Sequence, residues 1–321
     1  MRRLSLILLL WLFSALPALG QSAGDLPLVG VLRLNTMANV EPFPTIFRNA
    51  LAALGQVDGR NIRIELRLAE GHAERFPELA QGLVRDKAVA IFASGDAATR
   101  AAQQATRVIP IIAVVDDIVA AGLIASLARP GGNTTGVSIL AAELDAKRLE
   151  ILKQIVPAGR RFAILNDPAS ASAQSSQLDD ARRQLGVELA ILDVHGPENF
   201  APAFAALRAG GSEALVLHSS PLLFAFRDDL CRLSMAHKLP AIGQSREMAE
   251  AGCLMSYGVK MSEAFVMAAK LTNKVLRGAW PGDIPAEQPD KFELVINLKA
   301  AKALGLTVPP SLLVRADDVI E

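Results

Sequence analysis

Short apolar segments alternate with longer segments of helical spacing over the first half of the chain. In the longer segments, apolar residues recur every three or four positions, first around Leu51 and again around Leu79, and Gly55 ends the earlier run. This alternation is typical of a parallel β-sheet covered by helices, and it predicts a doubly wound α/β lobe. The expected strands of this lobe are Leu28–Leu34, Ile62–Leu68, Val89–Ser94 and Ile109–Val115.

The second half repeats the alternation. We therefore predict an α/β fold of two doubly wound parallel-sheet lobes joined by a hinge. The expected strands are Thr135–Leu140, Phe162–Leu165, Glu188–Asp193, Ala214–His218, Pro240–Ile242, Cys253–Tyr257 and Glu293–Ile296, and the expected helices include Ser262–Leu276 and Lys299–Leu304.

Three segments without helical pattern suggest where the chain crosses between the lobes. They are Arg129–Asn133, the neighbourhood of Tyr257, and the Pro-bounded segment Ile284–Pro289. The pattern alone leaves open which lobe the C-terminal segment joins. The boundaries that we predict are 26–134 with about 259–284 for the first lobe, and 135–258 with about 285–321 for the second.

The first twenty residues have the order of a cleavable export signal. Arg2 and Arg3 precede the apolar run Leu4–Leu16, and the small residues Ala18 and Gly20 follow it. The run is shorter than the roughly 20 residues that span a bilayer, although an uncleaved anchor remains an alternative. We predict cleavage after Gly20 and a periplasmic location, by general secretion rather than the twin-arginine route. No Cys lies near the predicted cleavage site, so we do not expect a lipid anchor.

Composition excludes several classes of function. The chain has 33 basic and 33 acidic residues, and the loss of Arg2 and Arg3 leaves 31 against 33, a net charge of −2. This balance gives no indication of nucleic-acid binding. The chain is 51% hydrophobic without a second run of membrane length, so we expect the apolar residues to fill a core.

The sequence carries no recognisable catalytic or metal-binding motif. The four histidines lack ligand spacing, and phosphate-loop, dinucleotide, nucleophile-elbow and zinc-protease motifs are absent. We expect no metal, no cofactor and no enzymatic activity, although His218 beside Ser219 leaves a hydrolase as a minor alternative. For Cys231 and Cys253, two buried free thiols are favoured over one disulfide.

The candidate ligand-binding residues lie in the loops after the predicted strands. Ligands of open α/β sheets bind outside the carboxyl ends of the strands, so two such lobes would face each other across a cleft. Phe43 and Tyr257 are the aromatic candidates. The loop candidates are Asn35, Thr36, Met37, Ser94, Gly95, Asp96, Asp116 and Asp117 in the first lobe, and Asn166, Asp167, Ser170, Ser219, Ser220, Gln244 and Arg246 in the second.

The charges of these loops suggest a zwitterionic ligand. Asp96, Asp116 and Asp117 suit an amino group, and Arg246 from the opposite lobe suits a carboxylate. Capping of a helix over Ile118–Leu127 explains Asp116 and Asp117 equally well. A helix beginning near Ala97 would also present backbone N–H groups.

Several segments of the chain resemble a known family. They include Arg129–Val137, Ala146–Glu150, Gly252–Gly258 and, most extensively, Lys291–Leu313. In these segments the chain resembles the ABC transporter substrate-binding proteins of the tryptophan/tyrosine-transporter type. The resemblance implies a periplasmic-binding-protein type I fold. As partners we expect a membrane permease with a separate ATPase, and we expect the receptor itself to be a monomer.

The function that we predict is an extracytoplasmic receptor of an ABC importer. It would bind a small polar solute, with an amino acid as one candidate, in the cleft between the lobes by hinge closure. A ligand sensor of the same fold is the alternative, followed by a hydrolase.

Overall fold

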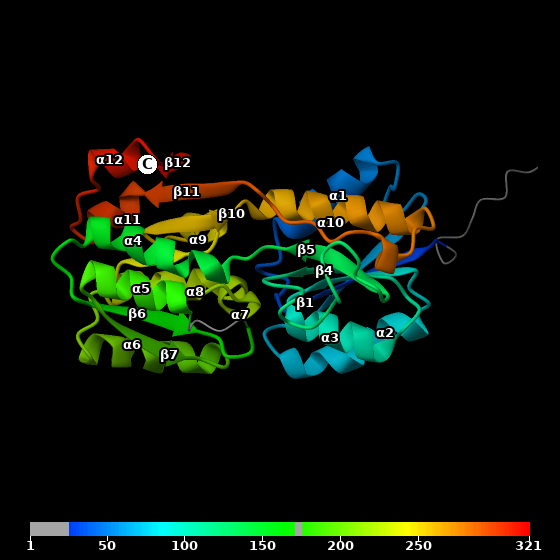
Figure 1. Ribbon diagram of the computed structural model, residues 1–321, viewed down its shortest axis with the longest axis horizontal. Helices are drawn as coiled ribbons and strands as arrows, with labels where there is room; N and C mark the ends of the chain where they lie inside the picture. Colours follow the sequence, from blue (N-terminus) through cyan, green and yellow to red (C-terminus); the bar gives the residue numbers. More distant parts are fainter. Residues whose placement is uncertain (1–25, 171–174) are drawn as a thin grey trace, which may run out of the picture.

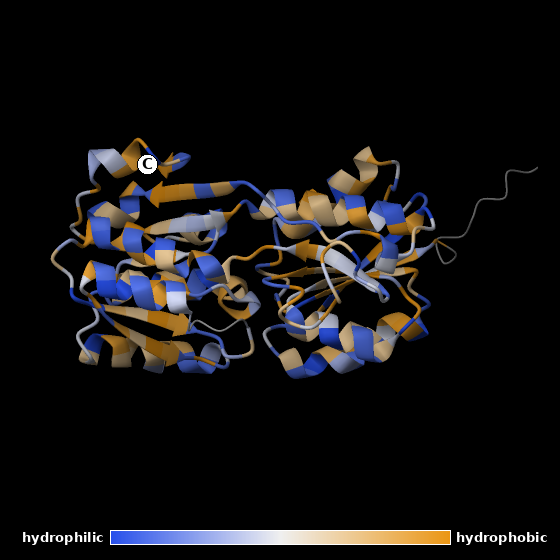
Figure 2. Ribbon diagram, in the orientation of Figure 1, coloured by the Kyte–Doolittle hydropathy of each residue, from blue (hydrophilic) through white to orange (hydrophobic). Residues whose placement is uncertain are grey.

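The computed structural model describes residues 26–170 and 175–321, which form two α/β lobes side by side (Figure 1). The export signal that we predict lies outside the described residues. Figure 2 shows that the strands inside both lobes are predominantly hydrophobic, whereas the helices covering them mix hydrophobic and hydrophilic positions. The predicted fold class is confirmed.

The first lobe is built on a parallel sheet in the order β2-β1-β3-β4-β5. Every residue of β1 is buried, and its side chains alternate between the two faces. Leu28 and Leu32 pack on one face, whereas Val29 and Val31 pack on the other. The strands are β1 (Leu28–Arg33), β2 (Arg63–Leu68), β3 (Ala90–Ser94), β4 (Ile111–Val115) and β5 (Thr134–Ser138).

Helices cover both faces of this sheet. One face carries α2 (Phe76–Arg85) and α3 (Asp96–Ala105), and the other carries α1 (Phe43–Ala53) and α10 (Met261–Leu276), which packs against α1 although it is distant in sequence. A short 3₁₀ helix, η1 (Ala73–Arg75), leads into α2.

The second lobe is built on a sheet in the order β12-β11-β10-β9-β8-β6-β7. Strands β10 and β11 are antiparallel, and the other pairs in the described sheet are parallel. The strands are β6 (Arg161–Asn166), β7 (Glu188–Asp193), β8 (Ala214–Leu217), β9 (Ala241–Gly243), β10 (Met255–Val259), β11 (Phe292–Asn297) and β12 (Asp318–Ile320).

Two helical layers cover the second sheet. The apolar cluster on one face includes residues of α4 and α5, and that on the other includes residues of α6 and α8. The helices of this lobe are α4 (Asp145–Ile155), α5 (Ser176–Leu185), α6 (Phe200–Ala209), α7 (Pro221–Ala225), α8 (Arg227–Ala236), α9 (Arg246–Glu250), α11 (Leu298–Ala303) and α12 (Pro310–Leu313), with the 3₁₀ helices η2 (Ala142–Leu144) and η3 (Pro197–Asn199).

The first crossing between the lobes occurs later than the sequence suggested. We assigned residues from 135 onward to the second lobe, but β5 pairs with β4 in the first sheet. The Arg129–Asn133 segment is therefore a loop within the first lobe. After β10 the chain returns to form α10 and η4 (Pro281–Asp283), and Thr135 Oγ1 donates to the Ile284 carbonyl at 2.8 Å. The last crossing follows the bridge between Val137 and Glu287 and precedes β11.

Two local predictions were wrong. Cys231 and Cys253 form a disulfide rather than two free thiols, because the fold brings α8 against the turn before β10, with Cα atoms 4.6 Å apart. No helix forms over Ile118–Leu127, where the chain makes a series of turns. Asp117 caps the first of these turns by accepting from the backbone N–H groups of Val119 and Ala120.

In the described part of the chain, no helix combines the length and the apolar character needed to cross a bilayer.

Candidate functional site

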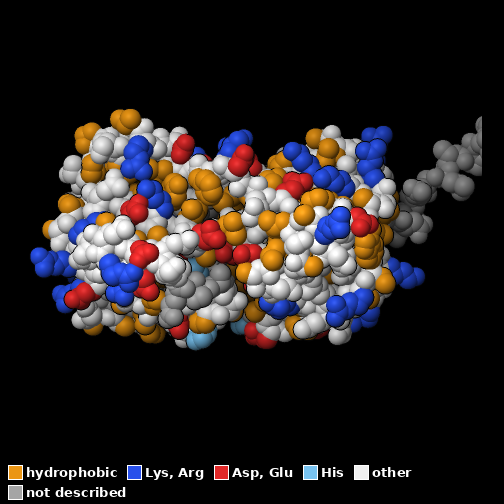
Figure 3. All heavy atoms as spheres, in the orientation of Figure 1, with side chains coloured by type: hydrophobic (Ala, Val, Ile, Leu, Met, Phe, Trp, Pro, Cys, Tyr) orange, Lys and Arg blue, Asp and Glu red, His pale blue; other side chains and the backbone are white. Residues whose placement is uncertain are grey.

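A cavity lies between the lobes, at the carboxyl ends of strands from both sheets. Its lining surrounds about 660 Å³ of empty space, which includes open solvent. Figure 3 shows Asp and Glu side chains at the junction of the lobes on one face of the molecule. The lining residues are Arg33, Leu34, Asn35, Ser94, Gly95, Asp96, Val114, Val115, Asp116 and Ile139 from the first lobe, Ser170, Ser219, Ser220, Pro221, Phe224 and Gln244 from the second, and Met261 at the start of α10.

The topology of each sheet explains this position. In the first sheet, β1 lies between β2 and β3, so the loops after β1 and β3 diverge to opposite faces. In the second sheet, β6 lies between β7 and β8, so the loops after β6 and β8 also diverge to opposite faces. Such switch points leave a crevice at the carboxyl edge of an α/β sheet. All four loops contribute residues to the cavity.

Nine residues predicted from the sequence line this cavity. They are Asn35, Ser94, Gly95, Asp96, Asp116, Ser170, Ser219, Ser220 and Gln244. Asp167 lines an adjoining cavity of about 550 Å³, which also contacts Ser94, Gly95 and Asp96. The two cavities together form one cleft between the lobes.

The other predicted residues do not line the cavity. Met37 is exposed, and Thr36 donates its backbone N–H to Asn39 Oδ1. Phe43 is buried in the first core against Phe47, Phe92 and Phe265.

Asn166, Tyr257 and Arg246 have partners within the second lobe. Asn166 Nδ2 donates to Asp193 Oδ1, and the Tyr257 ring packs against Phe292. The Arg246 guanidinium pairs with Glu293 and Asp318, and these partners, Asp318 foremost, raise its pKa. Arg246 therefore ties α9 to β11 and β12.

The lobes approach each other closely beside the cavity at Gly95. Its φ of 90° lies in the left-handed region, and a Cβ at this position would lie 2.6 Å from Pro221 Cγ of the opposite lobe. Both the conformation and the contact require glycine. Gly95 also positions α3, because its carbonyl accepts from the Thr99 backbone N–H and hydroxyl. The N-terminus of α3 is thereby fixed at the cavity.

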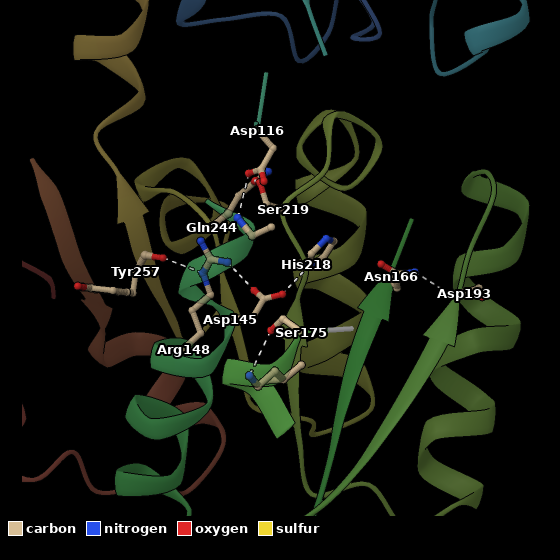
Figure 4. Close-up of polar contacts among 12 residues, drawn as sticks. Asp116, Asp145, Arg148, Asn166, Ser175, Asp193, His218, Ser219, Gln244 and Tyr257 are labelled. Atoms are coloured by element: carbon tan, nitrogen blue, oxygen red, sulfur yellow. Dashed lines mark hydrogen bonds and ion pairs between the residues drawn. The ribbon is translucent and has the colours of Figure 1, made fainter. Parts of the chain in front are cut away.

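Asp116 and Asp96 place two carboxylates in the cavity wall. Asp116 Oδ1 accepts from the Ala142 backbone N–H at 2.9 Å, and Figure 4 shows Asp116 beside Ser219 and Gln244 of the second lobe. Burial raises the pKa of Asp116, against the lowering effect of that backbone bond and of the positive Arg148. Burial also raises the pKa of Asp96, with Arg100 opposing. A ligand cation would offset the cost of ionising these groups.

The second-lobe side of the cavity is held by hydrogen bonds among its own side chains. Ser219 Oγ donates to Gln244 Oε1, and Gln244 Nε2 donates to the Ser220 carbonyl at 3.1 Å. Ser220 Oγ donates to Asp167 Oδ2 and accepts from the Leu223 N–H, which caps α7. These bonds fix the orientation of both serines.

A buried charge network lies behind these groups (Figure 4). Asp145 Oδ1 accepts from Arg148 Nη1 at 2.5 Å, and Asp145 Oδ2 contacts His218 Nδ1 at the same distance. Arg148 Nε donates to the Tyr257 carbonyl. The network joins the start of α4 to β8 and β10, so it fixes the loops after these strands. The contribution of Tyr257 to this network is therefore its backbone carbonyl, not its ring.

Arg33 is the charged lining residue that the sequence analysis missed. It ends β1 and is only 3% exposed. Nε donates to Asn35 Oδ1 at 3.1 Å, and Cζ lies 4.3 Å from the centre of the Phe43 ring. Burial, followed by the charge of Arg227, lowers the pKa of Arg33 to about 9. The signal available in the sequence was a charge within the apolar run Leu28–Leu34.

Within 26–170 and 175–321, no group of three or more His, Cys, Asp and Glu side chains is arranged to hold a metal ion.

The comparisons with known proteins agree with this architecture. The family described as ABC transporter substrate binding protein matches residues 45–320. The chain belongs to this family. It is a substrate-binding protein, whose family implies a small-molecule ligand and a membrane ABC transporter as partner.

Individual relatives resemble the chain over most of its length. A tyrosine-binding protein of Clostridioides difficile is 27% identical over 87% of this chain and 81% of its own. The structure of an ABC domain from Streptococcus pneumoniae in complex with L-Trp has a TM-score of 0.82 at 22% identity, covering 92% of this chain and all of that one. A ligand-free, open substrate binding protein from Clostridium difficile has a TM-score of 0.61 at 24% identity, covering 92% and 99%.

The raised pKa of Asp116 predicts a specific pH dependence of stability. The folded carboxyl releases its proton at a higher pH than the unfolded one, whose ordinary value is 3.8. The folded state therefore binds more protons between these two values, and the contribution of Asp116 to stability falls as pH rises through this window. In Asp116→Asn this titration is absent and an oxygen can still accept from Ala142.

We expect the free energy of unfolding of Asp116→Asn, relative to wild type, to increase from about pH 4 upward and then level off. Urea denaturation of both proteins at a series of pH values measures this difference. The exposed Asp290 supplies the control variant Asp290→Asn. Parallel pH profiles for wild type and Asp116→Asn would contradict the assignment of a perturbed carboxyl.

Proposed function

We propose that this protein is the extracytoplasmic receptor of an ABC importer and that it binds a small polar solute, an amino acid being the first candidate, between its lobes. The observation that carries the proposal is the cavity itself, which takes its lining from both lobes. A solute bound there would contact both lobes. Its binding energy can therefore favour the closed form over an open one.

The contacts between the lobes support closure as the binding step. Arg227 of α8 donates through Nη1 to the Asn39 carbonyl at 3.1 Å and through Nη2 to the Glu41 carbonyl at 3.3 Å. Asn39 Nδ2 donates in return to the Ala225 carbonyl. Three crossings of the chain connect the lobes, between β5 and η2, between β10 and α10, and between Glu287 and β11, and such connections can serve as a hinge.

The relatives support an amino acid as the solute. The C. difficile relative is named a tyrosine-binding protein, and the S. pneumoniae structure holds L-Trp. The cavity here contains both an arginine and two aspartates, which suit the two charges of an amino acid. The proposed ligand-binding residues are the nine predicted residues that line the cavity, together with Arg33.

Binding without catalysis is proposed for the same cavity. The family is one of substrate binding. The hydrolase alternative required Ser219 as a nucleophile, but its hydroxyl donates to Gln244 Oε1. A nucleophilic serine would instead donate to a base. We further propose that the receptor is a monomer that delivers its solute to a permease driven by a separate ATPase.

Export to the periplasm is part of the proposal, and the disulfide supports it. Disulfides persist in oxidising compartments such as the periplasm. The bond between Cys231 and Cys253 therefore fits the export signal of residues 1–20. We expect the mature protein to begin at or within a few residues of Gln21, which N-terminal sequencing of the periplasmic protein checks. Recovery of an intact N-terminus in the cytosol would contradict export.

The solute should remain bound through gentle purification. We expect native mass spectrometry to detect one small molecule per chain, and the same molecule should be recovered chemically unchanged after prolonged incubation. When the solute is added back to solute-free protein, the radius of gyration measured by X-ray scattering should decrease, because closure brings the lobes together. A protein that carries no solute, or that converts it, would contradict the receptor proposal.

Arg227 does not itself line the cavity, so closure can be weakened without substituting a lining residue, although its Nη1 also donates to the carbonyl of the lining residue Phe224. Arg227→Met keeps the packing of the side-chain stem but loses both hydrogen bonds to the first lobe. Because the apparent dissociation constant varies inversely with the population of the binding-competent form, we expect affinity for the recovered solute to fall about 5-fold or more. Calorimetry measures this change.

The matched control is Arg232→Met on the same helix. Arg232 pairs with Asp229 within α8 and is exposed. Its substitution should leave affinity unchanged. Equal affinities for the Arg227 variant and wild type would show that these contacts do not contribute to closure.

A further inference from the structure

In the cavity wall, the guanidinium of Arg33 forms no ion pair with any residue in the described part of the chain. Arg33 is nearly fully buried, and within residues 26–170 and 175–321 its Nη1 has no hydrogen-bond partner. Its other contacts hold the guanidinium in place: Nε donates to Asn35 Oδ1, and the rings of Phe43 and Phe265 lie 4.3 and 5.3 Å from Cζ. We propose that Arg33 binds a carboxylate of the solute, which makes the solute a small monocarboxylate, amino acids included.

Electrostatics supports a ligand as the missing partner. The charged groups that act on Arg33 across the cleft are Arg227, which repels it, and Glu247, which attracts it. Neither forms an ion pair with it, and Glu247 Oε2 is itself buried and has no hydrogen-bond partner among the residues that the structure describes. Burial of a cation without a counter-ion costs free energy, and burial here lowers the pKa of the Arg33 guanidinium to about 9. A bound carboxylate would supply the missing negative charge.

The other charges of the cavity favour a carboxylate over a phosphate. The charged lining residues are Arg33, Asp96 and Asp116, so one positive group faces two negative ones. A phosphate group of charge near −2 would meet two aspartates and a single arginine. A carboxylate carries one charge and matches the planar fork of a guanidinium through two parallel hydrogen bonds. The two aspartates then remain available for an amino group.

This inference rests on the proposed function, and its test compares probes that differ only in the carboxylate. The probe pairs are L-tyrosine with L-tyrosinamide, L-leucine with L-leucinamide, and benzoate with benzamide. Calorimetry with solute-free protein should give binding for at least one acid and affinity lower by about 30-fold or more for its amide. In Arg33→Gln the acid should bind about 30-fold or more weakly, and the preference for acid over amide should disappear.

The control variant is Arg48→Gln. Arg48 lies on α1 of the same lobe, pairs with Asp58 and does not line the cavity, so its substitution should leave both affinities unchanged. Thermal unfolding of solute-free Arg33→Gln gives a second readout. Since the substitution removes an uncompensated charge, the melting temperature should not fall, whereas loss of a structural arginine would lower it.

The outcomes separate the two proposals. Equal binding of an acid and its amide by wild type, or wild-type affinity in Arg33→Gln, overturns the role of Arg33 and leaves the receptor function standing. Binding of uncharged solutes alone does the same, as does a co-purified solute that lacks a carboxylate. If no probe binds but a co-purified solute has a carboxylate, that solute takes the place of the acid in the Arg33→Gln comparison. Failure of every probe to bind, together with purified protein that carries no small molecule, overturns the receptor function and this inference with it.

Discussion

Three crossings of the chain hold the carboxyl edges of two sheets face to face, and the other features of the site depend on this arrangement. Each parallel sheet brings its loops to one edge, and each has a switch point where neighbouring loops diverge. A single lobe would offer only a shallow crevice at that point. Opposed across the cleft, the two crevices enclose one cavity, with Gly95 of the first lobe in contact with Pro221 of the second.

Buried charges in the cleft fall into two groups with different physical roles. Asp145 bonds to both Arg148 and His218, and Arg148 Nε donates to the Tyr257 carbonyl, so these groups stabilise the loops of the second lobe. Arg33 is buried and Asp96 and Asp116 are half-buried without an ion-pair partner among the described residues, and burial shifts the pKa of each toward its neutral form. Groups perturbed in this way cluster at functional sites. The contrast distinguishes the framework of the site from its binding surface.

Much of the candidate site could be predicted from strand ends alone. Ser94, Asp96, Asp116, Ser219 and Gln244 follow buried strands, and a parallel sheet brings all such positions to one edge. The same reasoning failed for Arg246. It also follows a strand, but carboxylates of β11 and β12 in its own lobe pair with its side chain. The direction of a long side chain depends on neighbours that are remote in sequence.

The sequence by itself determined the two α/β lobes, because the period of apolar residues specifies strands and helices locally. Tertiary structure decided what depends on distant segments meeting. Only pairing with β4 shows that β5 belongs to the first lobe, and only the packing of α8 shows that Cys231 meets Cys253. Arg33 is the clearest case. In the sequence it is one charge at the end of an apolar strand, and its lack of a counter-ion is defined by side chains from both lobes.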